Sequence, residues 1–309
     1  MTVTLEEWLT LPRTVIAAMV AEQRLTVKLA IDGSRRHYLL HHPNEQGEIV
    51  DAAHYLAAEF AQLLTILDIL FSCGVENMVL LAVWPPDLTQ RTDHLHQIVD
   101  SSKRLLLSDT AVELFQRLEL RVALYGDFDI SPALAGVRDE LLTLRHSLRA
   151  LTANGKRSLV WGYSSGSGLD EVIARTVLLY QTLGRMPTEA EVRAACFPDG
   201  PERIDVYIGS GRLEVDNITL PVLLKQGCLD MYHLAHLALD LTEGEVRRIL
   251  YDRIFRRSVS RVDNPGYTPD VLTPLRAYYT QHAECVVGLG QLIGNTLWCP
   301  DHDHRTAER

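Results

Sequence analysis

The sequence predicts an α/β fold with a mostly parallel six-stranded sheet and helices on both faces. Short apolar runs of strand length alternate with longer segments in which apolar residues recur at spacings of three and four. Strands that alternate with helices in this way form parallel sheets, because each helix returns the chain to the same edge. Several of the strand-length runs also stop at glycine- or proline-containing turns, as expected for strand ends.

The elements can be placed in chain order. A helical pattern covers residues 5–20 and is interrupted by Pro12. Thr188 begins a short helix, and Glu191 is placed to complete a capping box. Predicted strands cover residues 26–31, 78–83, 121–125, 158–162 and 204–208, with residues 231–239 read as a sixth strand or a helix. Predicted helices cover residues 51–71, 93–117, 133–152, 169–183 and 242–261, with a polar loop before the first of them.

Composition limits the class of protein. Hydrophobic residues make up 47% of 309 residues, which is enough for one large core. We expect residues 1–262 to form a single catalytic domain and residues 263–309, which contain four prolines, to form a C-terminal extension. The net charge of −10 argues against broad nucleic-acid binding but allows a local basic pocket.

Location is predicted from what the chain lacks. The acidic start, with Glu6 and Glu7, does not resemble a signal peptide, and no apolar run reaches about 18 residues, so no membrane span is expected. The cysteines are odd in number and scattered, which is typical of reduced thiols in the cytoplasm. They are Cys73, Cys196, Cys228, Cys285 and Cys299.

The first strand is followed by Asp32-Gly33-Ser34-Arg35-Arg36. In an open α/β sheet, ligands bind beyond the carboxyl ends of the strands. Paired guanidinium groups next to backbone amides suit a phosphate or diphosphate, and an acid among them suits Mg²⁺ or the positioning of a water molecule. The alternative reading is an ordinary turn with two solvated arginines.

Three other strand ends carry unusual sequences. They are residues 84–87 (Trp-Pro-Pro-Asp), 163–168 (Tyr-Ser-Ser-Gly-Ser-Gly) and 209–212 (Gly-Ser-Gly-Arg). The last of these suits an anion, because small residues let backbone amides approach it. Convergence of all four at one edge of the sheet would be a stronger signal than any one of them.

Three other candidate sites are weaker. Residues 162–166 fit the G-x-S-x-G nucleophile elbow of serine hydrolases, with Ser164 as nucleophile and Asp205 plus His233 or His236 as partners. Residues 299–304 contain metal-capable side chains, but a frayed tail is the simpler reading. The basic helical face could bind phosphate, although such faces are more often solvated or at interfaces. Its members are Arg247, Arg248, Arg253, Arg256, Arg257 and Arg261.

Several of these segments resemble the cis-prenyltransferases, the undecaprenyl diphosphate synthase family. Residues 31–36 are similar to the first motif of the family, in which an aspartate, a glycine and an arginine hold an allylic diphosphate with Mg²⁺. Gly126-Asp127 resembles the end of its third strand. Residues 229–232 resemble a stretch whose glutamate binds metal, with Asp230 in its place. The resemblance covers roughly residues 25–260 and implies the family's fold.

Two departures point away from chain elongation. Elongating members have Ser-Thr-Glu-Asn-Trp where this chain has residues 84–87, and Arg-x-Ser-Gly-Glu-x-Arg where it has residues 209–212. In those members, the second motif binds the diphosphate group of isopentenyl diphosphate, the second substrate of elongation. This binding motif is incomplete in the present chain. A closer similarity is to the diterpene synthases of the tuberculosinol synthase and kolavelool synthase type, through residues 32–36, 208–212 and 247–252.

This resemblance implies a diterpene synthase that ionises a preformed bicyclic C20 allylic diphosphate, such as kolavenyl or tuberculosinyl diphosphate, and quenches the cation with water. It implies Mg²⁺ as cofactor, a homodimer, and an upstream class II diterpene cyclase as functional partner. A chain-elongating or inactive cis-prenyltransferase subunit, a nucleophile other than water, and the choice for Asp32 between metal binding and aiming water stay open. The implied catalytic residues are Asp32 and Tyr55; the diphosphate-binding residues are Gly33, Ser34, Arg35, Arg36, Gly211 and Arg212; the cation-stabilising residues are Trp84 and Tyr163; and the metal ligands are Asp32 and Asp230.

Overall fold

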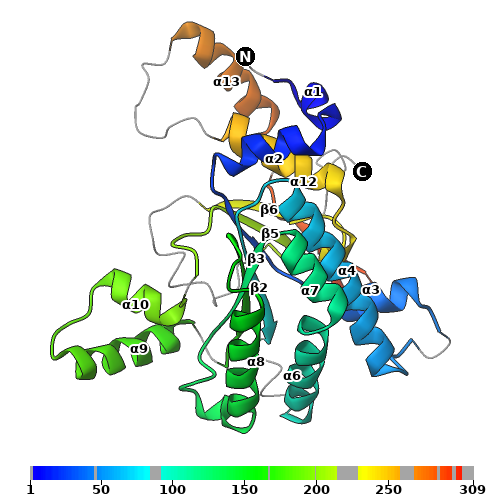
Figure 1. The fold of residues 1–309 in the computed structure, drawn as a ribbon. Coiled ribbons are helices and arrows are strands. Elements are labelled where there is room, and N and C mark those ends of the chain that lie inside the picture. The colour runs from blue at the N-terminus through cyan, green and yellow to red at the C-terminus, as the bar shows by residue number, and fades with distance from the viewer. Residues whose placement is uncertain are drawn as a thin grey trace.

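The computed structural model describes residues 3–44, 47–83, 92–165, 168–198, 200–213, 229–257, 268–283, 286–293 and 297–300. Its centre is a six-stranded sheet in the order β3-β4-β2-β1-β5-β6, and every neighbouring pair is parallel (Figure 1). The predicted fold class is therefore confirmed. The strands are β1 (Thr26–Leu29), β2 (Asn77–Val83), β3 (Leu120–Tyr125), β4 (Arg157–Tyr163), β5 (Val206–Ser210) and β6 (Asp230–Leu234).

Strand β1 is fully buried and lies between β2 and β5, so the strand order reverses there. In parallel α/β sheets, such a switch point leaves a crevice outside the carboxyl ends of the strands. Val27 pairs with Val206 and Leu29 with Ile208, which brings the loops after β1 and β5 to the same edge. The topology thus puts two of the unusual strand ends next to each other.

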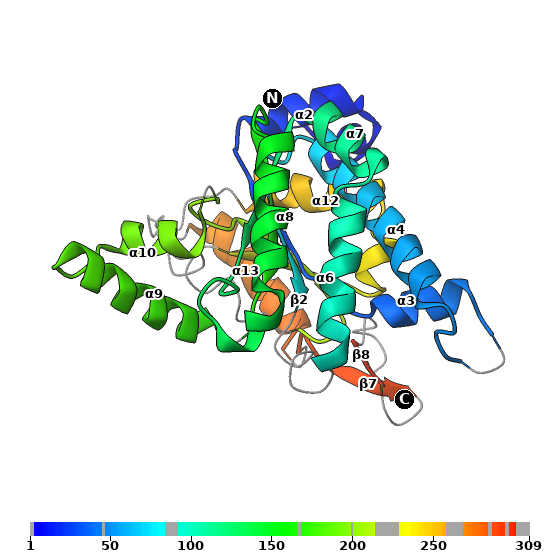
Figure 2. The same cartoon turned by 60° about the horizontal axis from the view of Figure 1, so that its bottom comes forward.

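The helices cover the two faces of the sheet unequally. In Figures 1 and 2, α4, α6 and α8 lie side by side over one face, while the pair α9–α10 projects away from the other helices. The main core lies under the first group, and a smaller core around Tyr125 and Phe197 lies on the opposite face. The helices are α1 (Leu5–Thr10), α2 (Arg13–Ala21), α3 (Ser34–His41), α4 (Ala52–Ser72), α6 (Thr92–Leu106), α7 (Asp109–Arg117), α8 (Arg138–Leu151), α9 (Gly168–Leu183), α10 (Glu189–Cys196), α12 (Glu243–Tyr251) and α13 (Pro269–Gln281), with shorter helical turns η1 (Pro132–Val137), η3 (Ala238–Asp240) and η4 (Asp252–Arg256).

Helix α4 runs along the main core. The Asp51 side chain caps it by accepting hydrogen bonds from the amides of Ala53 and His54, and its inward face is buried through Phe71. At 21 residues and a mean hydropathy of 1.4, it is the one helix in the described chain that is long and apolar enough to cross a membrane by length and composition. Buried core helices of soluble proteins pass the same test. In this protein, 44% of that apolar window is buried inside the fold.

Two sequence predictions need correction. No helix is predicted between the first strand and residue 51, yet α3 covers Ser34–His41 ahead of the polar loop. The helix predicted over residues 93–117 is two helices, since Ser108 caps α7 by accepting from the Ala111 amide. Residues 230–234 are a strand, which resolves the open choice for that segment, although the strand ends before Leu239. The break at Pro12 and the capping box of Thr188 with Glu191 are confirmed.

The N-terminal helix is fastened to α12. The Trp8 indole N–H donates to the Arg247 carbonyl at 2.8 Å, and the Tyr251 hydroxyl donates to the Val3 carbonyl at 3.0 Å. Farther along the chain, α13 has no buried residue, and β7 (Gly290–Ile293) pairs with β8 (Leu297–Pro300) in a separate antiparallel hairpin. The division into residues 1–262 and 263–309 stays a prediction.

Candidate active site

The first turn of α3 has the features of helix ends that bind anions. Gly33 precedes it with a φ of +80°, a left-handed conformation that glycine adopts without strain. Gly33 has no side chain that could cap the helix, and the first amides of any helix have no hydrogen-bond partner within it. The amides of Ser34, Arg35 and Arg36 therefore point out of the helix with its positive dipole end, as in phosphate sites.

The loops after β1 and β5 touch at Asp32. A Cβ atom on Gly211, which has a φ of +75°, would lie 2.8 Å from Asp32 Oδ2. The same carboxylate oxygen accepts a hydrogen bond from Arg36 Nη2 at 3.0 Å. Only glycine allows this approach, so Gly211 places the backbone leading into Arg212 against Asp32.

Positive charge exceeds negative charge at this point. Arg35 and Arg212 are exposed, and within the described chain neither has a carboxylate within ion-pair distance. Asp32 is bound by Arg36 alone among described basic side chains, and its side chain is 59% exposed. Two guanidinium groups that have no carboxylate partner among the described residues, next to a helix N-terminus, are features that suit a polyanion.

A cavity of about 770 Å³ opens beside these residues. This volume lies within the range of roughly 300–1,000 Å³ that is usual for small-molecule sites. Ser34 and Arg35 line it at the α3 end, and the remaining wall comes mainly from α4, α6 and the sheet. The apolar residues of that wall include Leu56, Phe60, Leu63, Leu80, Leu81, Ile98, Leu105 and Trp161.

Tyr55 connects the polar end of the cavity to its apolar wall. It lies in the first turn of α4 and lines the cavity, and its hydroxyl is 2.7 Å from the Ser34 hydroxyl. The Tyr38 ring packs against the Tyr55 ring edge to face, with centroids 5.3 Å apart. The sequence-predicted residues Asp32, Ser34, Arg35 and Tyr55 are thus brought together.

The aromatic walls differ from the expectation. Tyr163 is 0% exposed, belongs to the core, and is not part of the cavity wall; burial raises the pKa of its hydroxyl to about 12. Trp161, two residues earlier on β4, lines the cavity with Phe60, whose ring centroid is 6.2 Å away. Trp161 and Tyr163 are two residues apart on β4 and both join the main core, so strand alternation places them on one face but does not distinguish the one that lines the cavity. Trp84 lies outside the described residues.

Asp230 does not join Asp32, which corrects its predicted role as a second metal ligand. It pairs with Val206 at the first residue of β5, whereas the site lies beyond Ser210, four residues or roughly 13 Å along the strand. Its carboxylate is bound by Arg253 Nε at 3.0 Å and Arg257 Nη1 at 3.4 Å. These ion pairs neutralise Asp230 at the opposite edge of the sheet.

The serine-hydrolase reading is wrong. Ser164 follows β4, and His233 lies on β6, four strand spacings or roughly 19 Å away across the sheet. Asp205 lies at the amino edge, where it accepts from the Thr26 amide and pairs with Arg203. His236 also follows β6, and its Nε2 lies 2.6 Å from Glu245 Oε1, so neither histidine forms a triad with Ser164 and Asp205. Gly166 lies outside the described residues.

The basic face of residues 247–257 is structural. Arg247 binds Glu243 and the carbonyls of Leu9 and Leu11, which fastens the N-terminal helix. Arg257 binds Asp252 at 2.6 Å. The segment 247–257 therefore holds the N-terminal helix and its own turn in place. Arg261 and the metal-capable residues 301–304 lie outside the described residues.

Magnesium fits the Asp32 end of the site. Mg²⁺ prefers oxygen ligands and is usually held by one or two carboxylates together with substrate phosphates. The exposed Asp32 carboxylate supplies such oxygens, and the absence of a Cβ at Gly211 leaves space beside Oδ2. Asp32 is therefore the residue that would hold a magnesium–diphosphate pair.

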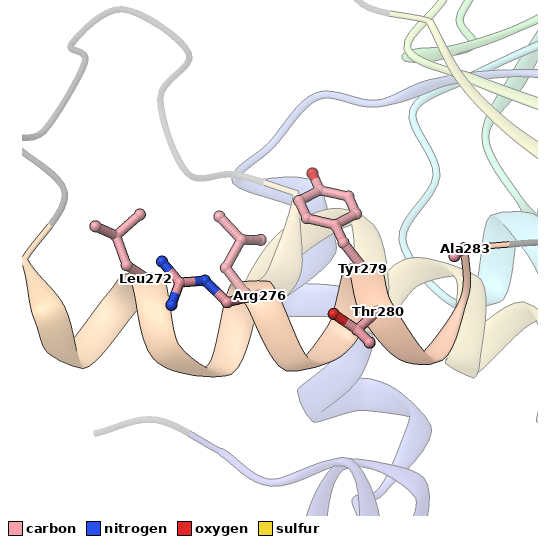
Figure 3. A pocket seen from close by; sticks show the side chains of 6 residues that line it. Leu272, Arg276, Tyr279, Thr280 and Ala283 are labelled. Atoms are coloured by element: carbon pink, nitrogen blue, oxygen red, sulfur yellow. The ribbon is translucent and has the colours of Figure 1, made fainter.

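A second hollow, of about 530 Å³, lies along α13. Figure 3 shows that its lining comes from α13 and from Ala283 just after it. Arg276 is the charged member of this lining, and no carboxylate or second guanidinium accompanies it there. The cavity beside α3 is the better candidate site.

Comparison with known proteins agrees with this geometry. No protein-family model matches the sequence. Tuberculosinyl adenosine transferase from Mycobacterium tuberculosis is 25% identical over 297 residues, which cover 95% of this chain and 97% of that protein. (+)-Kolavelool synthase from Herpetosiphon aurantiacus is 26% identical over 307 residues, which cover 97% and 96%.

Solved structures share the fold. A probable undecaprenyl diphosphate synthase from Campylobacter jejuni has a TM-score of 0.51 and is covered over 93% of its length. Lavandulyl diphosphate synthase from Lavandula x intermedia, in complex with dimethylallyl diphosphate, has a TM-score of 0.53 and is covered over 94%. Each is 16% identical and covers 74% of this chain. The chain therefore has the cis-prenyltransferase fold, and it is a distant homologue of tuberculosinyl adenosine transferase and (+)-kolavelool synthase.

Proposed function

We propose that this protein is an enzyme that acts on prenyl diphosphates and, more narrowly, a diterpene synthase that ionises a preformed bicyclic C20 allylic diphosphate and quenches the cation with water. One observation carries the proposal. The α3 N-terminus, with Ser34 and Arg35, lies at one end of a cavity of about 770 Å³ that also has aliphatic and aromatic walls. The names of the two homologues support a substrate of this class.

The chemistry begins with heterolysis of the allylic C–O bond, and the electron pair leaves with diphosphate. The first-turn amides of α3 and the guanidinium groups of Arg35, Arg36 and Arg212 stabilise that charge as it grows. One such preorganised donor typically contributes about 2.7–4 kcal/mol. Bound Mg²⁺ would add neutralisation of the diphosphate oxygens, with Asp32 as its protein ligand.

The remaining cation needs walls that stabilise it without reacting. The faces of Trp161 and Phe60 attract cations by roughly 0.5–2 kcal/mol. At the polar end, the Tyr55 hydroxyl is oriented by Ser34 and can direct a water molecule toward the cation. Water then forms the new C–O bond and gives a proton to the released diphosphate, so the charges balance. Asp32 serves either as the magnesium ligand or, with Tyr55, as the group that orients this water.

A second outcome is transfer of the prenyl group to adenosine, which the name of one homologue favours. Chain elongation is the third, since the fold also occurs in diphosphate synthases. A preformed bicyclic substrate requires an upstream class II diterpene cyclase, which the proposal includes as functional partner. Homodimer formation and a cytoplasmic location are part of the same proposal.

The test is an incubation of the protein with Mg²⁺ and a panel of C20 diphosphates, with and without isopentenyl diphosphate or adenosine, followed by mass spectrometry. We expect a C20 alcohol from one bicyclic diphosphate without a second substrate. Longer chains would indicate elongation, and a nucleoside adduct would indicate transfer. Arg35→Ala is expected to lower product formation by about 10²–10³-fold, whereas Arg104→Ala, which removes an exposed arginine paired with Asp100 on α6, is the matched control. Intact diphosphates throughout would overturn the proposal.

A further inference from the structure

A cluster of metal-capable side chains lies one helical turn beyond the anion site. His37 and His41 are four residues apart on α3, and Asp240 faces them from η3. Asp240 Oδ1 is 3.3 Å from His37 Nε2 and 3.5 Å from His41 Nε2, and the three ligand atoms lie within 4.8 Å of one another. The three side chains converge from two elements on one point.

The other ring nitrogens are already committed. His41 Nδ1 is 2.9 Å from the His37 carbonyl oxygen, which can only accept, so this nitrogen carries the proton. His37 Nδ1 is 2.7 Å from Glu59 Oε1, and a carboxylate oxygen accepts in the same way. Metal-binding histidines usually donate their second N–H to a carbonyl or a carboxylate, and this cluster has one of each.

These bonds leave both Nε2 atoms as lone-pair donors. In the neutral rings, two nitrogen lone pairs then face a carboxylate oxygen with no proton between them. A cation placed among the three atoms turns this repulsion into coordination. Two tetrahedral zinc ligands with bonds of about 2.0–2.1 Å are separated by about 3.3–3.4 Å, which matches the two distances from Asp240.

We propose that His37 Nε2, His41 Nε2 and Asp240 Oδ1 bind a zinc-class divalent cation, with Glu59 as the carboxylate that orients His37. Imidazole ligands select zinc and its transition-metal neighbours over Mg²⁺, so this site is chemically distinct from Asp32. His41 and Asp240 are partly exposed, which gives the ion a path from solvent. The cation links α3 to η3 and thereby steadies the helix whose first turn carries Ser34, Arg35 and Arg36.

The experiment measures zinc bound to the full-length chain after equilibrium dialysis against a buffered Zn²⁺ concentration. Wild-type protein is expected to hold one equivalent more than His41→Ala, and Asp240→Asn is expected to bind it more weakly. His42→Ala is the matched control, because His42 neighbours the cluster but packs on Tyr38 and His54 instead. Since the His41 side chain is 51% exposed, its truncation leaves no buried void, and circular dichroism checks the fold.

Thermal unfolding with and without Zn²⁺ supplies the second readout. Wild type and His42→Ala are expected to melt at a higher temperature with Zn²⁺, and His41→Ala is not. Zinc bound by cysteines or by residues 301–304 would be the same in every variant. Only the difference in zinc content between the variants therefore measures binding at this cluster. Equal zinc content in wild type and His41→Ala would overturn the proposal and leave an ion pair of protonated histidine with Asp240. Displacement by millimolar Mg²⁺ alone would also overturn it.

Discussion

The two edges of the central sheet carry the same residue types and use them differently. At the amino edge, Asp205 and Asp230 are buried and bound by arginines, among them Arg203, Arg253 and Arg257. At the carboxyl edge, Arg35 and Arg212 are exposed and have no described carboxylate partner. Neutralised charge stabilises a fold, whereas uncompensated charge next to a cavity attracts a ligand of opposite sign.

Residue type and motif alone therefore do not assign function in this chain. Asp32 and Asp230 both follow the pattern of metal ligands in the sequence, yet one lies at the open edge and the other in an ion-pair network. Position along a parallel strand separates them. Four predictions test whether this contrast is real.

The largest effect is expected at the carboxyl edge. Arg35→Ala and Arg212→Ala should each lower kcat/KM for the C20 diphosphate by about 10²–10³-fold, because each removes a donor to the leaving diphosphate. The free energy of unfolding should change by less than about 0.5 kcal/mol, since neither side chain pairs in the described fold. Steady-state kinetics and denaturant unfolding measure the two quantities. An unchanged kcat/KM in both variants would contradict the anion site.

The opposite result is expected at the amino edge. Asp230→Ala should lower the free energy of unfolding by roughly 3 kcal/mol, because Arg253 and Arg257 lose their buried partner. The folded fraction should keep its kcat and its dependence on Mg²⁺. Chemical denaturation and a magnesium titration check this prediction. A weakened magnesium response with unchanged stability would restore Asp230 as a metal ligand.

The carboxyl edge itself is not uniformly basic. Beyond β3 and β4, Glu171 is buried near Asp127 and Asp129, and burial is the main cause that raises its pKa to about 7, against the attraction of Arg175. An acid whose pKa is raised by folding stabilises the protein fully below its unfolded pKa of 4.5 and loses that contribution as the pH rises through 7. This end of the edge is therefore unsuited to a diphosphate.

Glu171→Gln tests that contrast. Between pH 4.5 and pH 7, wild-type protein should lose roughly 2–3 kcal/mol of unfolding free energy that the variant keeps. Urea unfolding at a series of pH values measures the difference, and Glu189→Gln on exposed α10 is a suitable control. Parallel pH profiles for wild type and Glu171→Gln would show that Glu171 titrates as an ordinary carboxyl.

The smallest effect on activity is expected at Tyr55, which lies between the polar end of the cavity and its apolar wall. Tyr55→Phe removes the hydroxyl bonded to Ser34 and should lower kcat about tenfold, the value of one hydrogen bond. If Tyr55 orients water, the variant should also form more hydrocarbon and less alcohol, as mass spectrometry would reveal. Asp32→Asn separates the two roles of the carboxylate. If Asp32 binds magnesium, the variant should need a higher Mg²⁺ concentration; if Asp32 orients water, the variant should change the ratio of alcohol to hydrocarbon. An unaltered rate and product ratio in Tyr55→Phe would remove this residue from the mechanism.

Much of the site was predictable because it lies close together in the sequence. Asp32 to Arg36 follow one strand directly, and Gly211-Arg212 follow another. Helix α3 was missed because its residues 34–41 carry arginines and histidines rather than a regular apolar stripe. Trp161 was missed because the strand reads as a uniform apolar run, which conceals the side that faces the cavity.

The sequence by itself determined the alternation of strands and helices, the breaks at Pro12 and Gly33, and the chemical character of the strand ends. Local sterics and side-chain periodicity decide these features, and both act over a few residues. Only the tertiary structure decided that β1 lies beside β5, that Asp230 faces the other edge, and that Asp240 meets His37 and His41. These contacts join residues far apart in the chain, and strand order, register and packing of the whole core select them together.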